Sequence, residues 1–232
     1  MAVGAGLALC GLLMQSLFRN PLSGPYVLGL SSGASLGVSL LILGGSVGLP
    51  GWAIVENTGI GRITAAALGA IGVLALVVAT ASRVRDTMAL LLVGLMIGSM
   101  TSAVVSIFTY VSDEQSLKQY AIWTMGQLGG VQGPWLYGLW ILVILGGILS
   151  VPLAKSMNAV LLGESTALSL GIDLKTYKWM VIGITGALTG GITALVGPIA
   201  FVGLAVPHLC RISLQTSDHR VLIPAVMIGG AV

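Results

Sequence analysis

LAKSMNAVLLGESTALSLGIDLKTYKW, residues 153–179, is a polar segment with three lysines that lies between two long apolar runs of the chain. Within it, Gly163-Glu164-Ser165-Thr166 predicts the start of a helix with an acid in its first turn, and Gly171 predicts its end. We expect the apolar side of this helix to consist of Ala167, Leu168 and Leu170. A folded polar segment in this position indicates a surface for a soluble partner.

The composition of the whole chain defines its broad class. Of the 232 residues, 56% are hydrophobic and only 7% are charged, and the mean hydropathy is +1.04. Soluble domains carry roughly 25% charged residues, so this composition predicts an integral membrane protein. The 34 glycines suit helices that pack closely in lipid. Small residues recur at four-residue spacing, as in Gly29, Gly33 and Gly37, in Gly94 and Gly98, and in Gly186 and Gly190.

Apolar runs between charged residues and Pro/Gly turns predict the membrane spans, each of which needs about 20 apolar residues. We expect spans near residues 1–18, 31–45, 63–82, 87–111, 135–151 and 179–196, a short or broken helix near 199–212, and a further span from 221. The predicted fold is therefore all-α, a polytopic transmembrane helical bundle with roughly eight helices. Since the chain starts and stops inside apolar runs, we expect residues 1–232 to be one transmembrane domain that is truncated at both ends.

The basic residues predict how the bundle is oriented, because Lys and Arg collect in cytoplasmic loops. Alternating spans place only two of them, Arg62 and Lys118, on one side. The other side holds Arg19, Arg83, Arg85, Lys155, Lys175, Lys178, Arg211 and Arg220. Residues 153–178 are thus predicted to be a cytoplasmic loop, and residues 46–61 and 112–134 to face outward.

The outward segment 112–134 carries helix signals of its own. Ser112 and Gln115 have the spacing of a capping box, and Tyr120 and Trp123 suit a helix in the membrane interface. Glycines after Met125 then let the chain turn back. Two interpretations remain open at this point: a platform for an extracytoplasmic protein, or a helix that only returns the chain.

Several kinds of chemistry have no support in the sequence. The spans hold no Asp, Glu, Lys or Arg near a bilayer centre, where proton-coupled and ion-coupled carriers usually place them. His208 and His219 have no nucleophile or ligand set beside them, and no phosphate-binding GxxxxGK[ST] loop occurs. Cys10 and Cys210 are expected to be small core side chains. We predict no catalytic residue, no metal site, no bound cofactor and no nucleic-acid partner.

Several long motifs support a resemblance to a known family. They are the run Gln15-Ser16-Leu17-Phe18-Arg19-Asn20-Pro21-Leu22, Leu28-Gly29-Leu30-Ser31-Ser32-Gly33-Ala34, Leu162-Gly163-Glu164 with Ala167 and Leu170-Gly171, Gly197-Pro198-Ile199-Ala200-Phe201-Val202-Gly203-Leu204, Val206-Pro207-His208 with Arg211, and Asp218-His219-Arg220-Val221-Leu222-Ile223-Pro224. In this order they resemble the permease subunits of bacterial ABC importers for ferric siderophores, haem and vitamin B12. The resemblance covers essentially the whole chain.

The resemblance implies a type II ABC importer permease fold, with about ten helices per full-length subunit. It implies a cytosolic ABC ATPase dimer that uses ATP and Mg and grips the loop containing Gly163, Glu164, Ser165, Ala167, Leu170 and Gly171. It also implies a periplasmic substrate-binding protein, a second permease subunit in a homodimer or a paired heterodimer, surrounding membrane lipid, and a multi-pass location in the bacterial inner membrane. Family members have a further span before the position of Met1 and others beyond that of Val232.

The resemblance further implies a cytoplasmic gate at the turn of Asn20, Pro21 and Leu22 and at Thr87 and Met88. Met88 departs from the small hydroxyl residue expected there. Met14 and Gln15, one turn above the turn at Asn20, are expected to face the passage. Two rival functions remain: a secondary carrier or gated channel that works without an ATPase, and a membrane scaffold whose polar loop anchors a cytosolic enzyme.

Overall fold

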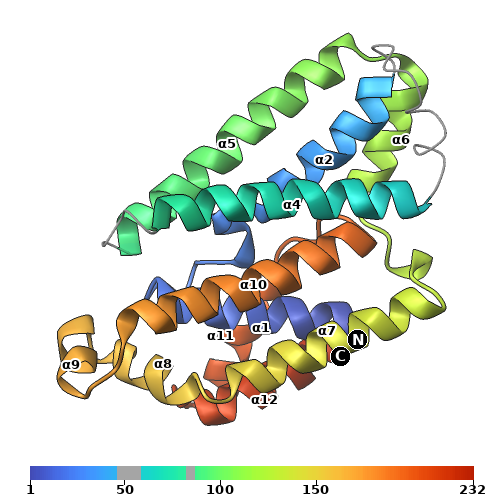
Figure 1. The fold of residues 1–232 in the computed structure, drawn as a ribbon. Helices are drawn as coiled ribbons and strands as arrows, with labels where there is room; N and C mark the ends of the chain where they lie inside the picture. The colour runs from blue at the N-terminus through green and yellow to red at the C-terminus, as the bar shows by residue number, and fades with distance from the viewer. Residues whose placement is uncertain (46–58, 82–86) are drawn as a thin grey trace. The chain divides into compact units, whose positions relative to one another are not determined.

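The computed structural model describes residues 1–45, 59–81 and 87–232, and in them every regular element is a helix (Figure 1). The prediction of an all-α fold is confirmed. The α-helices are α1 (Ala2–Leu17), α2 (Leu30–Gly45), α4 (Gly59–Ala81), α5 (Thr87–Val111), α6 (Glu114–Thr124), α7 (Pro134–Ser150), α8 (Ala154–Leu161), α9 (Glu164–Ser169), α10 (Leu174–Val196), α11 (Val202–Leu214) and α12 (His219–Ala231). Short 3-10 turns cover Pro25–Leu28 and Leu128–Gly130.

Each predicted span corresponds to one of these helices, and the short helix near 199–212 corresponds to α11. Within the described ranges, α4, α5 and α10 are long and apolar enough to cross a membrane, and α7 with α8 forms a fourth candidate that bends by 57°. Helices α1, α2, α11 and α12 are apolar but shorter. Residues 46–58 of the predicted outward segment, with Arg83 and Arg85, lie outside the described residues.

The described chain forms two compact units. The first contains residues 1–25, 134–189 and 200–232, and the second contains residues 26–133 and 190–199. In the first unit α1 packs against α7, α8, α11 and α12. Every residue of α1 except Gly4 is buried, so α1 is a core helix without a solvent-facing or lipid-facing side.

Backbone contacts at glycines hold α1 against its neighbours. A Cβ atom added to Gly11 would lie 1.5 Å from the carbonyl oxygen of Gly203 in α11. A Cβ atom added to Gly4 would lie 1.9 Å from the carbonyl oxygen of Gly230 in α12. Since a real Cβ atom cannot approach an oxygen so closely, both crossings require glycine.

The second unit is also held by backbone contacts at glycines, and in it α2 lies between α4 and α5 (Figure 1). A Cβ atom on Gly69 would lie 2.1 Å from the carbonyl oxygen of Gly33, and one on Gly37 would lie 2.0 Å from that of Ala65. Gly94 of α5 meets the backbone of Val27 just before α2. The expectation that small residues at four-residue spacing let these backbones touch is confirmed for α2, α4 and α5.

The start of α6 differs from the capping box predicted at Ser112 and Gln115. Asp113 is the N-cap, and its carboxylate accepts a 3.1 Å hydrogen bond from the backbone N–H of Ser116. This bond holds the pKa of Asp113 below its usual value. Ser112 directly follows α5, so its hydroxyl instead donates to the carbonyl of Phe108 in the last turn of that helix.

The aromatic residues of α6 pack inward in part. Tyr120 and Trp123 are stacked with ring centroids 6.3 Å apart, and both pack against a core that includes Ala34, Val38 and Ile42. That residues 112–134 form an extracytoplasmic interfacial segment stays a prediction.

Gly11→Ala tests the glycine crossing. We expect the added methyl group to separate α1 from α11 and to lower the free energy of unfolding in detergent by about 2 kcal/mol. Gly183→Ala in α10 is the matched control, because nothing lies within 4 Å of its added Cβ, and it should be neutral or stabilise by up to about 1 kcal/mol. Equal thermal unfolding midpoints for the two variants would contradict the packing argument.

Candidate functional site

The loop between α7 and α10 contains two short helices whose ends are fixed by glycine. Gly163 has φ +117° and separates α8 from α9. At the other end of α9, Gly171 has φ +78°, its N–H donates to the Leu168 carbonyl at 2.9 Å, and the N–H of Ile172 donates to the Ala167 carbonyl at 3.0 Å. This pair of bonds is a Schellman motif, which requires the left-handed conformation that glycine favours. The predicted start and end of this helix are confirmed.

The predicted apolar side of α9 is wrong in part. Ala167 is fully buried against α8, but Leu168 is 59% exposed and Leu170 is 62% exposed. Helix α9 has six residues, which is less than two turns, so only one side chain, that of Ala167, faces the neighbouring helix. We call the exposed residues Leu162, Glu164, Ser165, Leu168 and Leu170 the α9 surface.

The α9 surface carries three leucines, one acid and one serine, next to the exposed polar residues Thr166 and Ser169, and it projects from its unit beyond the start of α10 (Figure 1). Such a grouping of exposed leucines on a fixed backbone is typical of a protein contact. Gly163 and Gly171 shape its two ends, and Ala167 attaches it to α8. All six residues of the predicted coupling set thus lie in one short helix and its caps, although their role stays a prediction.

A hydrogen-bonded cluster ties α8 to α12. The Asn158 amide nitrogen donates to Asp218 Oδ1 at 2.7 Å, and Asn158 Oδ1 accepts from the backbone N–H of His219 at 3.0 Å. Asn158 Oδ1 also lies 2.7 Å from His219 Nδ1. Because that oxygen can only accept, Nδ1 must carry a proton. His219 is buried, so its ring position is fixed by this cluster.

Asp218 serves two helices at once. It is the N-cap of α12, where its carboxylate accepts from the backbone N–H of Arg220 at 2.9 Å, and it also accepts from Asn158. These bonds, first that of Arg220 and then that of Asn158, hold the pKa of Asp218 below its usual value. The sequence analysis missed this cluster, because Asn158 lies 60 residues from Asp218 and no local pattern connects them.

The start of α10 is held in a similar way. The Asp173 carboxylate accepts from the Thr176 hydroxyl and from the backbone N–H of Lys175, the latter at 3.0 Å, and these bonds, chiefly that of Thr176, lower the pKa of Asp173. One turn further, the Tyr177 hydroxyl donates to Ser16 Oγ of α1 at 3.2 Å, in a buried contact. The loop is therefore attached to the core helix α1 as well as to α12.

The predicted gate residues have varied surroundings. Met14 and Gln15 are buried inside the first unit, where Gln15 accepts from the Arg211 guanidinium and donates to the Leu204 carbonyl at 3.3 Å. These contacts, which the sequence analysis also missed, join α1 to α11.

Of the other predicted gate residues, Asn20, Leu22 and Met88 lie nearer the surface. Asn20 Oδ1 accepts from the backbone N–H of Leu22 at 2.9 Å, which fixes the turn and leaves Leu22 exposed. Thr87 begins α5 in the second unit, and Met88, which follows it, is exposed. The gating role of all six residues stays a prediction.

Among the described residues, neither cysteine forms a disulfide or belongs to a cluster of potential metal ligands. Cys10 and Cys210 are both free, and their thiols lie 3.9 Å from the Thr185 carbonyl and 3.7 Å from the Ala225 carbonyl. Across the described ranges, no three His, Cys, Asp or Glu side chains gather to hold a metal ion.

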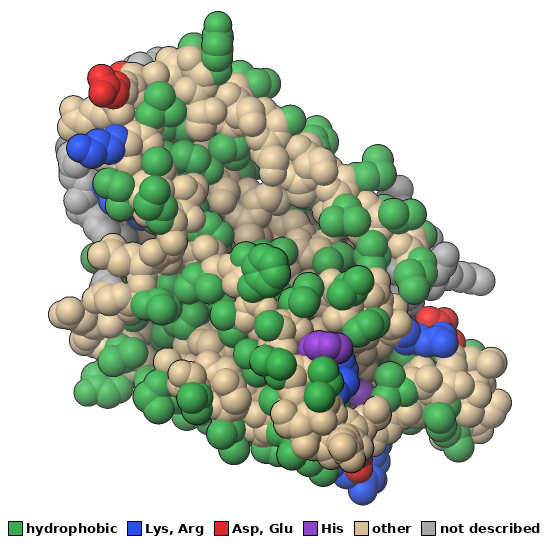
Figure 2. All heavy atoms as spheres, turned by 180° about the vertical axis from the view of Figure 1, so that it is seen from behind, with side chains coloured by type: hydrophobic (Ala, Val, Ile, Leu, Met, Phe, Trp, Pro, Cys, Tyr) green, Lys and Arg blue, Asp and Glu red, His purple; other side chains and the backbone are tan. Residues whose placement is uncertain are grey.

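Charged side chains are scarce on the molecular surface. On the face drawn in Figure 2, hydrophobic side chains are spread widely, and Lys, Arg, Asp and Glu side chains are few, most of them near its margins. This distribution suits a protein whose sides meet lipid.

Comparisons with known proteins agree with this description. A model of the FecCD transport family matches residues 1–232. The vitamin B12 import system permease protein BtuC of Klebsiella pneumoniae is 39% identical over 233 residues, which cover 100% of this chain and 67% of that protein. The hemin transport system permease protein HmuU of Yersinia pestis is 36% identical over 232 residues, which cover 100% of this chain and 68% of that protein.

A solved structure gives the same result. It is an inward-facing conformation of a transporter described as of the metal-chelate ABC type, and it matches with a TM-score of 0.86 and 33% identity over 99% of this chain and 71% of that chain.

The fold and these matches define a class, the multi-pass helical permease of an ABC transporter, which is a transport subunit and not an enzyme. The chain belongs to the FecCD transport family. The resemblance found in the sequence motifs is confirmed. In this family the ATPase is a separate subunit, which agrees with the absence of a phosphate-binding GxxxxGK[ST] motif from the sequence.

The Asn158 cluster can be tested by exchanging its two partners. Asn158→Asp should lower the thermal midpoint by several degrees, because it places two carboxylates face to face. Adding Asp218→Asn should restore the midpoint, since the amide introduced on α12 can donate to the carboxylate introduced on α8 and still cap the N–H of Arg220. Asp218→Asn alone is the control. It keeps a side-chain oxygen that accepts from Asn158 and caps the N–H of Arg220, so the thermal midpoint should change little. A double variant less stable than Asn158→Asp would contradict the cluster.

Proposed function

We propose that this chain is the membrane-spanning permease subunit of an ATP-driven importer that moves a metal chelate across the bacterial inner membrane. The cargo would be a ferric siderophore, haem or cobalamin. The observation that carries the proposal is the α9 surface: exposed leucines and an acid on a rigid, glycine-capped helix of a multi-pass bundle. The relatives named for vitamin B12, hemin and metal chelates support this class of cargo.

The α9 surface suits a contact with a cytosolic ATPase. Leu168 and Leu170 offer apolar area, and Glu164 in the first turn of α9 offers a negative charge to a basic partner. The partner subunits would bind ATP and Mg, and this chain would bind no cofactor. When ATP draws two such subunits together, their motion would reach this chain at α9.

The contacts of the first unit provide a route for that motion. Helix α9 packs on α8 through Ala167, α8 is hydrogen-bonded to the start of α12 through Asn158, and the start of α10 is bonded to α1 through Tyr177. Because α1 meets α11 and the far end of α12 backbone to backbone at glycines, α1, α11 and that end of α12 would tilt together as a rigid body. The passage would then open to one side of the membrane at a time.

Further partners belong to the same proposal. A periplasmic substrate-binding protein would deliver cargo from outside, with residues 112–134 as a platform. A second permease subunit, in a homodimer or a paired heterodimer, would form the other wall of the passage. Affinity for cargo would reside in the delivery protein, so a passage lined by apolar, Gly, Ser and Thr surfaces suffices.

A carrier or channel without an ATPase is less well supported. Helices α1, α2, α5 and α7 contain no Asp, Glu, Lys or Arg, although self-powered carriers commonly place such residues in their spans. Purified protein that moved solute across vesicles without nucleotide would favour the carrier.

Glu164→Arg tests the coupling contact. We expect uptake by the reconstituted complex to fall by about tenfold, because a basic residue faces a partner suited to an acid, while basal ATP hydrolysis by the partner stays within about twofold. Glu164→Asp, which keeps the negative charge in the first turn of α9, is the control and should leave the ratio of uptake to basal hydrolysis unchanged. Normal uptake by Glu164→Arg at normal membrane levels would count against the α9 contact.

Thiol labelling tests the orientation. In a Cys210→Ala background, Ser165→Cys and Gln115→Cys each place one thiol at an exposed position of α9 or α6, while Cys10 stays buried. An impermeant maleimide should label the thiol at position 115 in intact spheroplasts and the thiol at position 165 only after permeabilisation. Labelling of position 165 from outside would overturn the proposed direction of coupling.

A further inference from the structure

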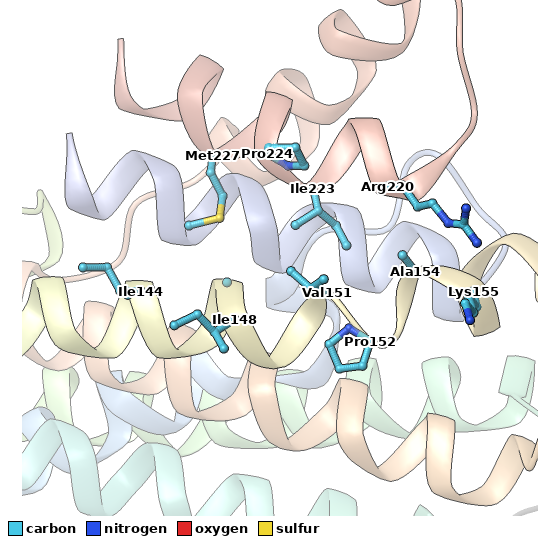
Figure 3. Close-up of a pocket in the computed structure, with 11 residues that line it drawn as sticks. Ile144, Ile148, Val151, Pro152, Ala154, Lys155, Arg220, Ile223, Pro224 and Met227 are labelled. Carbon is cyan, nitrogen blue, oxygen red and sulfur yellow. The ribbon is translucent and has the colours of Figure 1, made fainter.

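A groove of about 720 Å³ runs along the first unit between α7, α8 and α12 (Figure 3). Its walls are almost wholly apolar, with Ile144, Ile148 and Val151 on one side and Ile223 at its base. Ile148 and Val151 are exposed although they line a concavity. The groove therefore offers an apolar channel that no described side chain of the first unit fills.

Two cations close one end of the groove. Lys155 of α8 and Arg220 of α12 lie together at the end opposite Ile144 and Met227 (Figure 3). The bend of 57° between α7 and α8 produces this arrangement, because Pro152 cannot continue α7 and the chain turns so that Lys155 comes to the mouth of the groove. An apolar groove with a cationic end is complementary to an amphiphile with an apolar tail and an anionic head.

The nearby acid cancels only part of this positive charge. Asp218 lies beside Arg220 in sequence, but its carboxylate accepts from the Asn158 amide and from the backbone N–H of Arg220. Two cations against one carboxylate leave a net charge of +1 at this end. A phosphate group placed between Lys155 and Arg220 would meet donors from both side chains.

The groove also has the right place for a lipid and is long enough to hold a large part of one acyl chain. From Ile144 to Val151 the helix rises about 10 Å, which compares with about 15 Å for the acyl region of one leaflet. Lys155 and Arg220 belong to the set of basic residues that the charge pattern assigns to the cytoplasmic side, and basic pockets between helices on that side bind anionic headgroups.

We propose that this groove binds one phospholipid with an anionic headgroup, with an acyl chain along Ile144, Ile148 and Val151 and the phosphate between Lys155 and Arg220. The bound lipid braces α8 against α12 next to the α9 surface. The inference needs only the membrane location of the chain and holds whichever cargo is transported.

Retention of lipid can be measured on the purified protein by native mass spectrometry and by thermal unfolding in detergent. Phosphatidylglycerol should be retained in preference to phosphatidylcholine and should raise the unfolding midpoint. Lys155→Gln and Arg220→Gln should each weaken that preference by about fivefold, and the double variant should lose it. Lys175→Gln removes an exposed cation of the same unit that does not line the groove, and it should keep the preference.

A matched pair tests the apolar channel. Ile148→Trp should fill the groove and abolish retention, whereas Ile141→Trp, on the same helix and outside the groove, should not; the two isoleucines are 60% and 58% exposed. Equal retention in Ile148→Trp and Ile141→Trp, or an unchanged preference in the double glutamine variant, would overturn the proposal. So would displacement of the lipid by inorganic phosphate alone, or a change of oligomeric state in Ile148→Trp, which would assign the groove to a free anion or to a second copy.

Discussion

The carbonyl oxygens of Gly203 and Gly230 lie where a side chain of α1 would otherwise stand, and the first unit depends on these two contacts. In lipid the hydrophobic effect does not drive helices together, so close packing and backbone contact must hold them. Two glycines on α1, Gly4 and Gly11, let α11 and α12 come within contact of its backbone. The same solution occurs at Gly33 and Gly69 in the second unit. This packing buries α1 almost completely and leaves the periphery of the unit to carry its functional surfaces.

The loop that leaves this periphery is fixed by backbone geometry more than by burial. Helix α9 buries only Ala167, which contributes little hydrophobic free energy for so short a helix. The conformations of Gly163 and Gly171 shape its two ends instead, while the hydrogen bonds of Asn158 and Tyr177 anchor the flanking helices α8 and α10. A helix fixed in this way can expose leucines without collapsing onto them, which is what a contact surface for a second protein requires.

The sequence predicted the spans well because their limits are local. Charged residues, Pro and Gly mark the ends of each apolar run, and the start and end of α9 follow from Gly163 and Gly171 alone. The N-cap of α6 was misplaced from Asp113 to Ser112, since both residues can cap and the choice depends on where α5 ends. The exposure of Leu168 and Leu170 depends on which neighbour α9 meets. Contacts such as that of Gln15 with Arg211, 196 residues apart, depend on the packing of whole helices, so no window of sequence contains them.

Pro224 determines where α12 would bend when α8 moves. Pro224 cannot donate to the carbonyl of Arg220, and its ring crowds that carbonyl, so α12 is weakest one turn after the residues that Asn158 holds. A displacement of α8 acts on α12 through His219, before this weak point, while the far end of α12 is held against α1 at Gly4 and Gly230. The start of α12 can therefore move with the cytoplasmic loop while its end stays with the core. The lipid groove lies along the same stretch, from Arg220 to Met227, so an occupant there would resist bending at the point where the helix yields most easily.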